Sequence, residues 1–551
     1  MNIEGIENDI TKILFPYLAI NSETCEKGEK DAAAFLMDTI RSFGYFQNNG
    51  GHCGSFPIPG DPCGRSVCWG LVRGSGKETV IMMHHYDVVG IEDFKTLKNL
   101  AFDPESLEEA LTEMAWELPK EAAADLNSGE YLFGRGAADM KAGGAIQLAL
   151  LERYSKENNL KGNVLLIATP DEENISAGMR GAVLLLTELR DRFGLRFVYT
   201  FNSEPHQRKE SAAGLLSEGS VGKLLAFVYV RGFLAHAGKV FEGLNPLGVI
   251  SEIVARTELS GEFSDFADGE VSPPPTWLYL RDRKANYDVS MPLYAGGYVS
   301  ILTLGSTPAD ILTKLAKVSK EAFQSVIDRA NASYDSFNID SGREGAPLPW
   351  RADVVTYGEL LCGAVKECGE NFRRRYDEKL RLTEEEILSG TVSLTEAGFR
   401  LTEFILEQES DMSPRVVLGL MPPYYPSASN VKLAEGKNTC PELAGRLCDF
   451  AREKLAQIYD SEYYFTGISD CSYCSLEGSL EIEEALKDNM PLYGRPYSIP
   501  LSEIEALSMP CMNIGPWGKD FHKMTERVYK PDLYRYTPAM LAEAIRMVLG
   551  D

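Results

Sequence analysis

Histidine and carboxylate side chains at the ends of apolar runs are the residues of this sequence best able to do chemistry. The chain has only six histidines, and two of them belong to this group. Transition metals prefer imidazole and carboxylate ligands, and a two-metal site needs about five to seven of them, one carboxylate bridging both ions. Five short segments supply that inventory: His85-Tyr86-Asp87, Asp139, Asp171-Glu172-Glu173, Glu204 and His522. The inventory predicts a two-metal hydrolase.

His85 and Asp87 are two residues apart, so in an extended segment both side chains lie on one face. Asp87 can then accept a hydrogen bond from the ring nitrogen of His85 that does not hold a metal. That contact selects the tautomer and makes the imidazole a better donor. For the tripeptide alone, the alternative is a core histidine beside a surface aspartate. His84 is an alternative ligand, but it faces away if His85 points at the site.

Two further segments concentrate carboxylates. The glycine-rich turn 134–141 delivers a single acid, Asp139, at a predicted helix start, and its glycines permit close backbone approach. Asp139 alone would be an ordinary N-cap, whereas a bridging role explains an acid in so constrained a loop. Asp171-Glu172-Glu173 places three like charges after a buried strand, which is costly unless a divalent ion compensates. Adjacent carboxylates can then divide the work, one binding metal while its neighbour moves protons.

The first two hundred residues contain the elements that must position these side chains. Short apolar runs alternate with amphipathic segments, which is typical of an α/β domain with a largely parallel sheet. Strands are predicted at residues 80–83, 164–168 and 197–201, and a helix at 142–154. Four of the five candidate segments follow a predicted strand, and ligand sites in open α/β sheets form beyond the carboxyl ends of the strands.

The pattern changes near Gly219. A β-rich run at 224–230, a helix at 246–256, a strand at 298–304 and a helix at 308–334 suggest an α+β insertion, closed by the polar residues 335–349. Helices dominate from Trp350, and a final α/β portion holds apolar runs at 416–420, 463–470 and 511–514. Because His522 must return to the first domain, the simplest architecture is a catalytic domain of residues 1–216 and 341–551. A lid of residues 217–340 splits it.

Composition restricts the partners. The chain is 44% hydrophobic and 25% charged, with a net charge of −26, so it lacks the basic surface that nucleic acid or an anionic membrane requires. The charge is interpreted as a solubility feature, with attraction of a cationic substrate as the alternative. The first ten residues show no basic-then-apolar signal, and no apolar run approaches the roughly 20 residues that span a bilayer. Eleven cysteines without regular spacing fit a reducing cytosol, so we expect a cytoplasmic protein.

Two groups of cysteines are interpreted as ordinary thiols. Cys471 and Cys474 form a lone C-x-x-C without a second pair. The other group matches no common zinc-finger spacing and is interrupted by turns; it consists of His52, Cys53, Cys63 and Cys68. Zinc binding is the alternative for the group with His52, and redox or metal function is the alternative for the C-x-x-C.

Several motifs follow one another along the chain. They are His85-x-Asp87-Val88-Val89, Gly134-Arg135-Gly136 to Asp139-Met140-Lys141-Ala142-Gly143, Pro170-Asp171-Glu172-Glu173, Ser203-Glu204-Pro205, Ala235-His236-Ala237-Gly238, and Gly515-Pro516 to His522 and Glu526. Together they resemble the zinc-dependent aminoacylase, succinyl-diaminopimelate desuccinylase and carboxypeptidase family of metallopeptidases. The resemblance covers most of the chain. It implies an α/β fold with a three-layer, zinc-exopeptidase-like catalytic domain, a mostly parallel sheet and an inserted α+β lid.

The resemblance also implies a division of metal ligands. It places His85, Asp139 and Glu204 on one ion, and Asp139, Glu173 and His522 on the other. Asp139 is then the bridge. Two divalent ions are expected, with zinc as the metal and cobalt or manganese as alternatives.

Catalytic roles follow from the same motifs. The resemblance implies that Glu172 is the general base that activates water and later protonates the leaving amine. It implies that Asp87 orients His85. His236, from the lid, would stabilise a tetrahedral oxyanion; the alternative is a surface histidine on a loop.

Four longer stretches are closer to one branch of this family, the bacterial arginine-utilisation (RocB-like) proteins: Ile58-Pro59-Gly60-Asp61-Pro62, Pro422-Pro423-Tyr424-Tyr425-Pro426, Gly467-Ile468-Ser469-Asp470 and Ile514-Gly515-Pro516-Trp517-Gly518-Lys519-Asp520. Ser469 is a candidate substrate-binding residue. Where other members carry an arginine for a substrate carboxylate, this chain has Ser472 and Tyr473. Arg281 and Arg283 are interpreted as solvated, so recognition of a substrate carboxylate stays open.

The expected function is hydrolysis of an amide bond in a small peptide or N-acyl amino acid, with arginine or amino-acid catabolism as a setting. One alternative is a hydrolase of another amide or amidine metabolite on the same fold. Another is a catalytically silent regulatory or binding protein, although such a protein has little reason to keep Glu172 beside the ligands. The expected partner is the small-molecule substrate, and a homodimer formed through the lid is left open.

Overall fold

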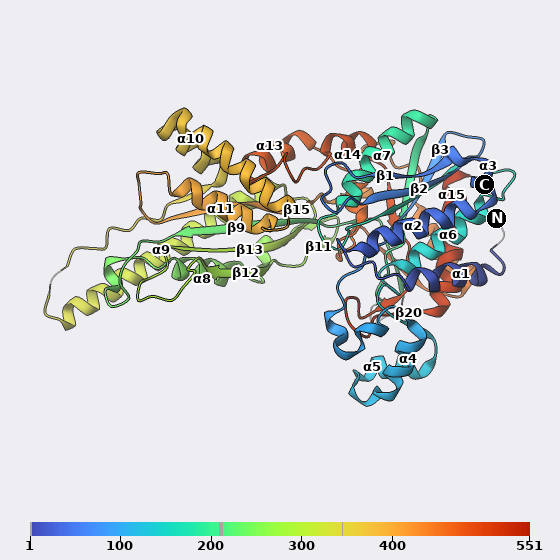
Figure 1. The fold of residues 1–551 in the computed structure, drawn as a ribbon, viewed down its shortest axis with the longest axis horizontal. Helices are drawn as coiled ribbons and strands as arrows, with labels where there is room; N and C mark the ends of the chain where they lie inside the picture. Colours follow the sequence, from blue (N-terminus) through green and yellow to red (C-terminus); the bar gives the residue numbers. More distant parts are fainter. Residues whose placement is uncertain (1–2, 209–212, 344, 551) are drawn as a thin grey trace. The chain divides into compact units, whose positions relative to one another are not determined.

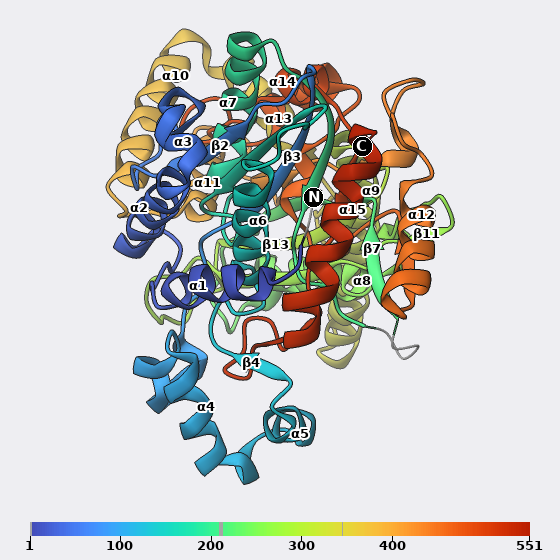
Figure 2. The ribbon, with the colours of Figure 1, turned by 90° about the vertical axis from the view of Figure 1, so that its right-hand side faces the viewer.

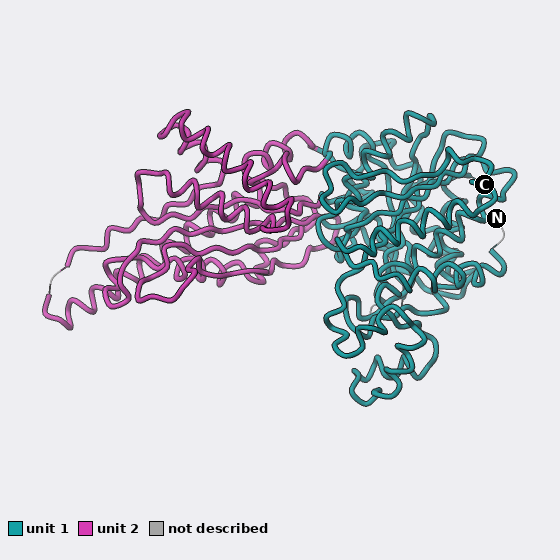
Figure 3. Tube along the Cα trace, in the orientation of Figure 1, with its two compact units in different colours: residues 1–221, 426–477, 500–551 teal, residues 222–425, 478–499 magenta. Residues whose placement is uncertain are grey.

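The computed structural model describes residues 3–208, 213–343 and 345–550, which divide into two compact units. Unit 1 comprises residues 1–221, 426–477 and 500–551, and unit 2 comprises residues 222–425 and 478–499 (Figure 3). Within the described ranges, no helix combines the length and the apolar character needed to cross a membrane.

Unit 1 is built on an eight-stranded sheet (Figure 1). In spatial order its strands are β1 (Cys53–Pro57), β2 (Ser66–Val72), β5 (Asn163–Thr169), β3 (Glu78–His85), β6 (Arg196–Asn202), β18 (Cys511–Asn513), β7 (Gly214–Ser217) and β17 (Tyr459–Glu462). The four central strands, β5, β3, β6 and β18, are parallel to their neighbours in that group. Antiparallel pairs flank them, including β1 with β2 and β2 with β5.

Helices cover both faces of this sheet. Alternate residues of each strand point to opposite faces, so each strand contributes to two packing layers. Val80 and Met82 of β3 join the main hydrophobic core. That core also takes in residues of α1 (Ile6–Leu18), α2 (Lys27–Ser42), α6 (Lys141–Tyr154), α12 (Leu443–Phe450) and α15 (Thr537–Leu549) (Figure 2). Ile81 and Met83 instead face Met179 and its neighbours in α7 (Ala177–Phe193), and α14 (Leu501–Leu507) packs on α7. The three-layer α/β fold expected from the sequence is confirmed.

A smaller lobe of unit 1 carries two of the segments that the sequence singled out. It contains α4 (Pro104–Glu113), α5 (Lys120–Ser128) and a three-stranded sheet of β19 (Gly518–Lys519), β20 (Arg527–Tyr529) and β4 (Tyr131–Phe133). Phe94, Leu107, Leu111 and Phe133 form its separate hydrophobic core. The sheet joins the chain before the Asp139 turn to the chain around His522, across almost four hundred residues of sequence.

Unit 2 contains a five-stranded sheet with β12 (Thr276–Asp282), β13 (Tyr294–Thr303), β9 (Gly222–Arg231), β15 (Arg415–Tyr425) and β14 (Val354–Thr356) in that order. Its long helices are α8 (Pro246–Thr257), α9 (Pro308–Asp340), α10 (Tyr357–Leu388), α11 (Leu394–Leu406) and α13 (Ser479–Asn489). Phe227, Tyr229 and Val417 pack with α10 and α11 to form its core. Helices α8 and α9 pack against each other, and α8 also packs on β9.

The observed units differ from the expected lid of residues 217–340. The polar stretch expected to close the lid begins inside α9, which continues to Asp340. The apolar run 416–420, expected in the catalytic domain, lies in β15 and pairs with β9 in the centre of the unit 2 sheet. The boundary expected at 340 was wrong. The apolar pattern of residues 416–420 predicts a buried strand, but it does not distinguish the sheet of unit 1 from the sheet of unit 2.

Two side chains also differ from their expected environments. Arg283, interpreted as solvated, donates to both carboxylate oxygens of Glu396, at 2.8 and 2.7 Å. Cys63, interpreted as a free thiol, forms a disulfide with Cys25. These partners are distant in sequence, so local spacing could not indicate them.

Candidate metal centre

Three neighbouring parallel strands deliver most of the candidate ligands to one edge of the unit 1 sheet. His85 is the last residue of β3, which pairs with β5 on one side and β6 on the other. Glu173 follows β5, and Glu204 follows β6. Because these strands are parallel, their carboxyl ends meet, as expected for a ligand site in an open α/β sheet.

Asp139 lies between two histidines. His85 Nε2 is 3.1 Å from Asp139 Oδ1, and His522 Nε2 is 3.3 Å from Asp139 Oδ2. Each carboxylate oxygen therefore faces a different imidazole, from segments almost four hundred residues apart. A carboxylate that bridges two metal ions presents its two oxygens in this manner.

A second carboxylate accompanies each histidine. His85 Nε2 is 3.6 Å from Glu204 Oε1, and His522 Nε2 is 3.2 Å from Glu173 Oε1. Asp139 therefore belongs to two three-residue groups, one with His85 and Glu204 and the other with His522 and Glu173. These are the two ligand sets that the motifs imply.

Burial and the charges of neighbouring side chains shift the pKa values of these candidate ligands. Burial, with the neighbouring Asp139 carboxylate, raises the pKa of Glu204 to about 8, and the same two causes raise the pKa of Glu173. Hydrogen bonds to Asp139 and Glu173 raise the pKa of His522 to about 10. Burial alone would lower the pKa of His85, but the Glu204 and Asp139 carboxylates raise it well above its ordinary value. Such a concentration of anions attracts cations, whether protons on the imidazoles or divalent ions.

The residues present fit a divalent metal. Among the described residues, Glu204 Oε2 is buried without a hydrogen-bond partner. A buried acceptor without a partner is costly, and a cation relieves that cost. One donor atom each from His85, Asp139 and Glu173 also lies within 4.8 Å of the others. Imidazole with carboxylate oxygen is a donor set that suits zinc and similar ions.

Asp87 contacts His85 differently from the sequence-based prediction. The ring Nδ1 of His85 is 3.0 Å from the backbone carbonyl oxygen of Asp87 and 3.6 Å from its carboxylate. The carboxylate instead accepts the backbone N–H groups of Glu172 and Glu173, at 3.1 and 3.2 Å, and the hydroxyl of Thr24 at 2.8 Å. Asp87 therefore orients the imidazole through its main chain and holds the Glu172–Glu173 segment through its side chain.

Glu526 holds the turn that carries Asp139. One of its oxygens accepts the N–H groups of Ala138 and Asp139, at 3.1 and 3.2 Å, and the other accepts Arg135 Nη1 at 2.6 Å. The structure thus assigns a positioning role to two residues that the sequence motifs contained without any role. The available signal was the charge of Arg135 inside a glycine-rich turn.

Glu204 is held through its main chain. Its carbonyl oxygen accepts Nδ2 of Asn513, the last residue of β18, at 2.8 Å. The chain then passes so close to Glu204 that a Cβ at Gly515 would lie 2.0 Å from that carbonyl oxygen. Only glycine fits this position.

A family model supplies the observation that identifies the chain. The model of peptidase family M20/M25/M40 matches residues 109–545. The chain belongs to this family. The resemblance drawn from the motifs is thereby confirmed, and the protein is a hydrolase of the M20 family.

Individual relatives agree with this assignment. The protein YqjN of Bacillus subtilis (strain 168) is 32% identical over an alignment of 551 positions that covers 98% of this chain and 97% of YqjN. Protein RocB of the same organism is 29% identical over an alignment of 534 positions that covers 96% of this chain and 92% of RocB. Among solved structures, a tripeptidase from Staphylococcus aureus shares the fold with a TM-score of 0.54 and 12% identity, and 99% of each chain is covered.

Three remaining candidates of the M20 chain lie in different environments. His84 faces α6, where its Nδ1 is 3.0 Å from Gln147 Oε1, and so points away from the ligands. Ser469 is buried and its hydroxyl accepts the N–H of Cys471 at 3.3 Å. His236 belongs to unit 2, where its exposed ring accepts the N–H of Gly238 at 3.0 Å.

Asp470 was not among the candidate residues, although the motif beside Ser469 contains it. The side chain is buried, accepts the hydroxyl of Thr169 at 2.8 Å with Oδ2, and has a pKa raised to about 7 by burial. Thr169 ends β5, immediately before the segment that carries Glu172. Asp470 therefore adds a further acid at the edge of the sheet where the candidate ligands meet.

Proposed function

We propose that this M20-family protein is a di-metal hydrolase that cleaves the amide bond of a small peptide or an N-acyl amino acid. The observation that carries the proposal is the position of Asp139 between His85 and His522, one carboxylate oxygen toward each imidazole. A single-metal site or a binding protein has no need for that geometry.

We assign His85, Asp139 and Glu204 to one ion, and Asp139, Glu173 and His522 to the other. When bound, two divalent ions would polarise the scissile carbonyl and lower the pKa of a bound water. Zinc fits the imidazole and carboxylate donors, and cobalt or manganese can replace it in such a set. The protein's own part is to hold these donors in place, through Asp87, Glu526 and Asn513.

Glu172 is the proposed general base. It is half-buried next to the ligands, and burial together with Glu204 and Glu173 raises its pKa well above the ordinary value. Its N–H donates to Asp87, which fixes the backbone from which its carboxylate extends. Glu172 takes a proton from the attacking water and returns it to the leaving amine, so one carboxylate serves both steps.

The proposed metabolic setting of the substrate rests on the sequence similarity to RocB. RocB covers almost the whole chain at 29% identity, and the four shared stretches motivate a substrate from arginine or amino-acid catabolism. We carry the role of His236, stabilising an oxyanion, into this proposal from its motif alone. The missing arginine at Ser472–Tyr473 argues that a free substrate carboxylate is bound differently here.

The test is a library of dipeptides, tripeptides and N-acyl amino acids, including arginine derivatives, offered to protein loaded with zinc, cobalt or manganese. We expect metal-dependent release of a free amine from at least one class, and its loss after chelation. Two equivalents of metal without hydrolysis of any compound would favour the binding protein. Hydrolysis with a single equivalent would contradict the di-metal assignment.

A further inference from the structure

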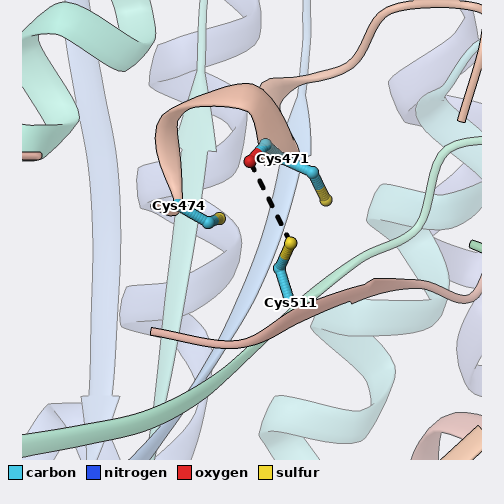
Figure 4. A group of neighbouring side chains, drawn as sticks. All are labelled: Cys471, Cys474 and Cys511. Atoms are coloured by element: carbon cyan, nitrogen blue, oxygen red, sulfur yellow. Dashed lines mark hydrogen bonds between the residues drawn. The ribbon is translucent and has the colours of Figure 1, made fainter. Parts of the chain in front are cut away.

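A second group of metal-binding side chains lies in unit 1 outside the candidate metal centre. Cys471 and Cys474 lie on the turn at Asp470–Tyr473 (η8) and just after it, and Cys511 begins β18. All three are buried, and their sulfur atoms lie within 4.8 Å of one another. Figure 4 shows the Cys511 sulfur pointing from the strand toward the turn. The lone C-x-x-C of the sequence thus gains a third cysteine in the fold.

Hydrogen bonds hold the two segments in this arrangement. The N–H of Cys474 donates to the carbonyl of Cys471 at 3.0 Å, which closes the turn. The Asn430 side chain binds both backbone groups of Cys511, accepting its N–H and donating to its carbonyl at 2.8 Å each. The N–H of Met509 donates to the carbonyl of Cys474 at 3.0 Å, so the turn and the strand are also joined directly. Three thiols held this way are preorganised.

Three buried thiols within reach of one another form a donor set that suits a soft cation. Thr200 also faces Cys474, and its hydroxyl donates to the Met509 sulfur at 3.2 Å. Cys474, Thr200 and Met509 also line one small cavity, so a thioether lies near Cys474.

We propose that Cys471, Cys474 and Cys511 form a structural site for one thiophilic d10 metal ion, Zn²⁺ or Cu⁺, with Met509 beside it. Soft thiolate and thioether donors select these ions over Mg²⁺ or Ca²⁺. Binding requires no oxidant, since each coordinating thiol loses a proton to solvent as its sulfur–metal bond forms.

Such an ion would connect β18 to the 470–474 turn, and both segments also contact residues near the candidate metal centre. Asn513, at the other end of β18, holds the carbonyl of Glu204, and Asp470, at the start of the turn, binds Thr169. Loss of the ion should therefore reduce thermal stability more than it affects any single step of hydrolysis.

Cobalt separates this site from the candidate metal centre, because thiolate ligands give Co²⁺ a sulfur-to-metal charge-transfer absorption in the near ultraviolet that imidazole and carboxylate ligands do not give. Metal-free, reduced full-length protein would be titrated with Co²⁺ alone, and bound metal counted. We expect the absorption in the wild type and in His522→Ala. We expect its loss, with about one equivalent less metal, in Cys474→Ser and Cys511→Ser. Cys68→Ala, at another buried thiol, should keep it.

Competition then identifies the ion. Displacement of Co²⁺ from the thiolate site by Zn²⁺ or by Cu⁺, at stoichiometric amounts, would show which of the two binds more tightly, and either result supports the site. Absence of the absorption in folded, reduced wild type would overturn the proposal. So would its persistence in both serine variants, or a mass spectrum showing a disulfide within the group in protein kept under reductant. Circular dichroism of each variant ensures that a lost absorption is not lost folding.

Discussion

Asp87 accepts the backbone N–H of Glu172 at 3.1 Å, and the neighbouring N–H of Glu173 at 3.2 Å. One buried carboxylate thus sets the main-chain position of both the proposed base and a proposed ligand. Through its own carbonyl, Asp87 also meets the ring of His85 at 3.0 Å. Asp87 therefore links strand β3 to the loop after β5. A substitution at Asp87 should disturb the ligands of both proposed metal positions.

Asp87→Asn should lower kcat by roughly 10- to 100-fold, the effect typical of losing a partner that orients metal ligands. The amide has only one acceptor oxygen, so one of the two N–H groups would face a donor. Steady-state kinetics and metal analysis measure the effect. Thr24→Val, which removes only the third hydrogen bond to Asp87, is the control and should change kcat much less. Equal activity of Asp87→Asn and wild type would mean that the carboxylate positions nothing.

Glu172→Gln should reduce kcat by about 10²- to 10⁴-fold while metal content stays at the wild-type level, because it removes proton transfer but no ligand. Glu173→Gln is the matched variant one residue away and should instead weaken one metal position. The pair is measured by elemental analysis and by turnover of the best substrate. Equal loss of metal in both variants would show that the base and ligand roles are wrongly divided.

His236→Ala should lower kcat by about 10²- to 10³-fold without loss of metal, the usual cost of removing one oxyanion donor. Lys239→Ala, an exposed residue of the same loop, serves as the control. A near-normal kcat for His236→Ala would assign that histidine to the surface and leave the oxyanion to other donors.

Metal binding should release protons and weaken in acid. The pKa of His522 is raised to about 10 by Asp139 and Glu173, so the metal-free protein carries that proton at pH 7 and must lose it on binding. Affinity should fall by about tenfold per pH unit for each proton displaced. Zinc added to the metal-free protein in weak buffer with a pH indicator measures the release, and equilibrium dialysis at pH 5, 6 and 7 measures the affinity. Binding that is independent of pH over this range would exclude His522 as a ligand.

Glu29 should make stability depend on pH. Burial raises the pKa of Glu29 to about 8, above its value of about 4.5 in the unfolded chain. Between these values the folded state binds more protons, so this residue's contribution to the free energy of unfolding falls as pH rises. Glu29→Gln cannot ionise and should gain a few degrees in Tm relative to wild type between pH 5.5 and 8.

Calorimetry at both pH values tests the role of Glu29. Glu26→Gln, an exposed neighbour in the same segment, is the control and should show the same difference from wild type at each pH. If Glu29→Gln also keeps a constant difference, the Glu29 carboxyl titrates alike in the folded and unfolded chain.

The positions of the proposed ligands could be predicted from the sequence because each depends on local pattern. His85, Glu173 and Glu204 follow apolar runs that proved to be β3, β5 and β6, and parallel strands bring their carboxyl ends together. The glycine-rich turn at Asp139 likewise shows its constraint within eight residues. Strand ends and tight turns depend on a few consecutive residues, so each proposed ligand could be predicted separately from its local sequence.

Pairing between distant segments could be known only from the tertiary structure. The run at 416–420 shows the pattern of a buried strand, but nothing in it says that β15 joins β9 rather than the larger sheet. Glu526 accepts a hydrogen bond from Arg135, and Cys511 lies beside Cys471 and Cys474. No local spacing in the sequence indicates either contact. A hydrogen bond or a cluster of thiols depends on where the whole chain returns in space, and that is set by the packing of entire sheets and helices.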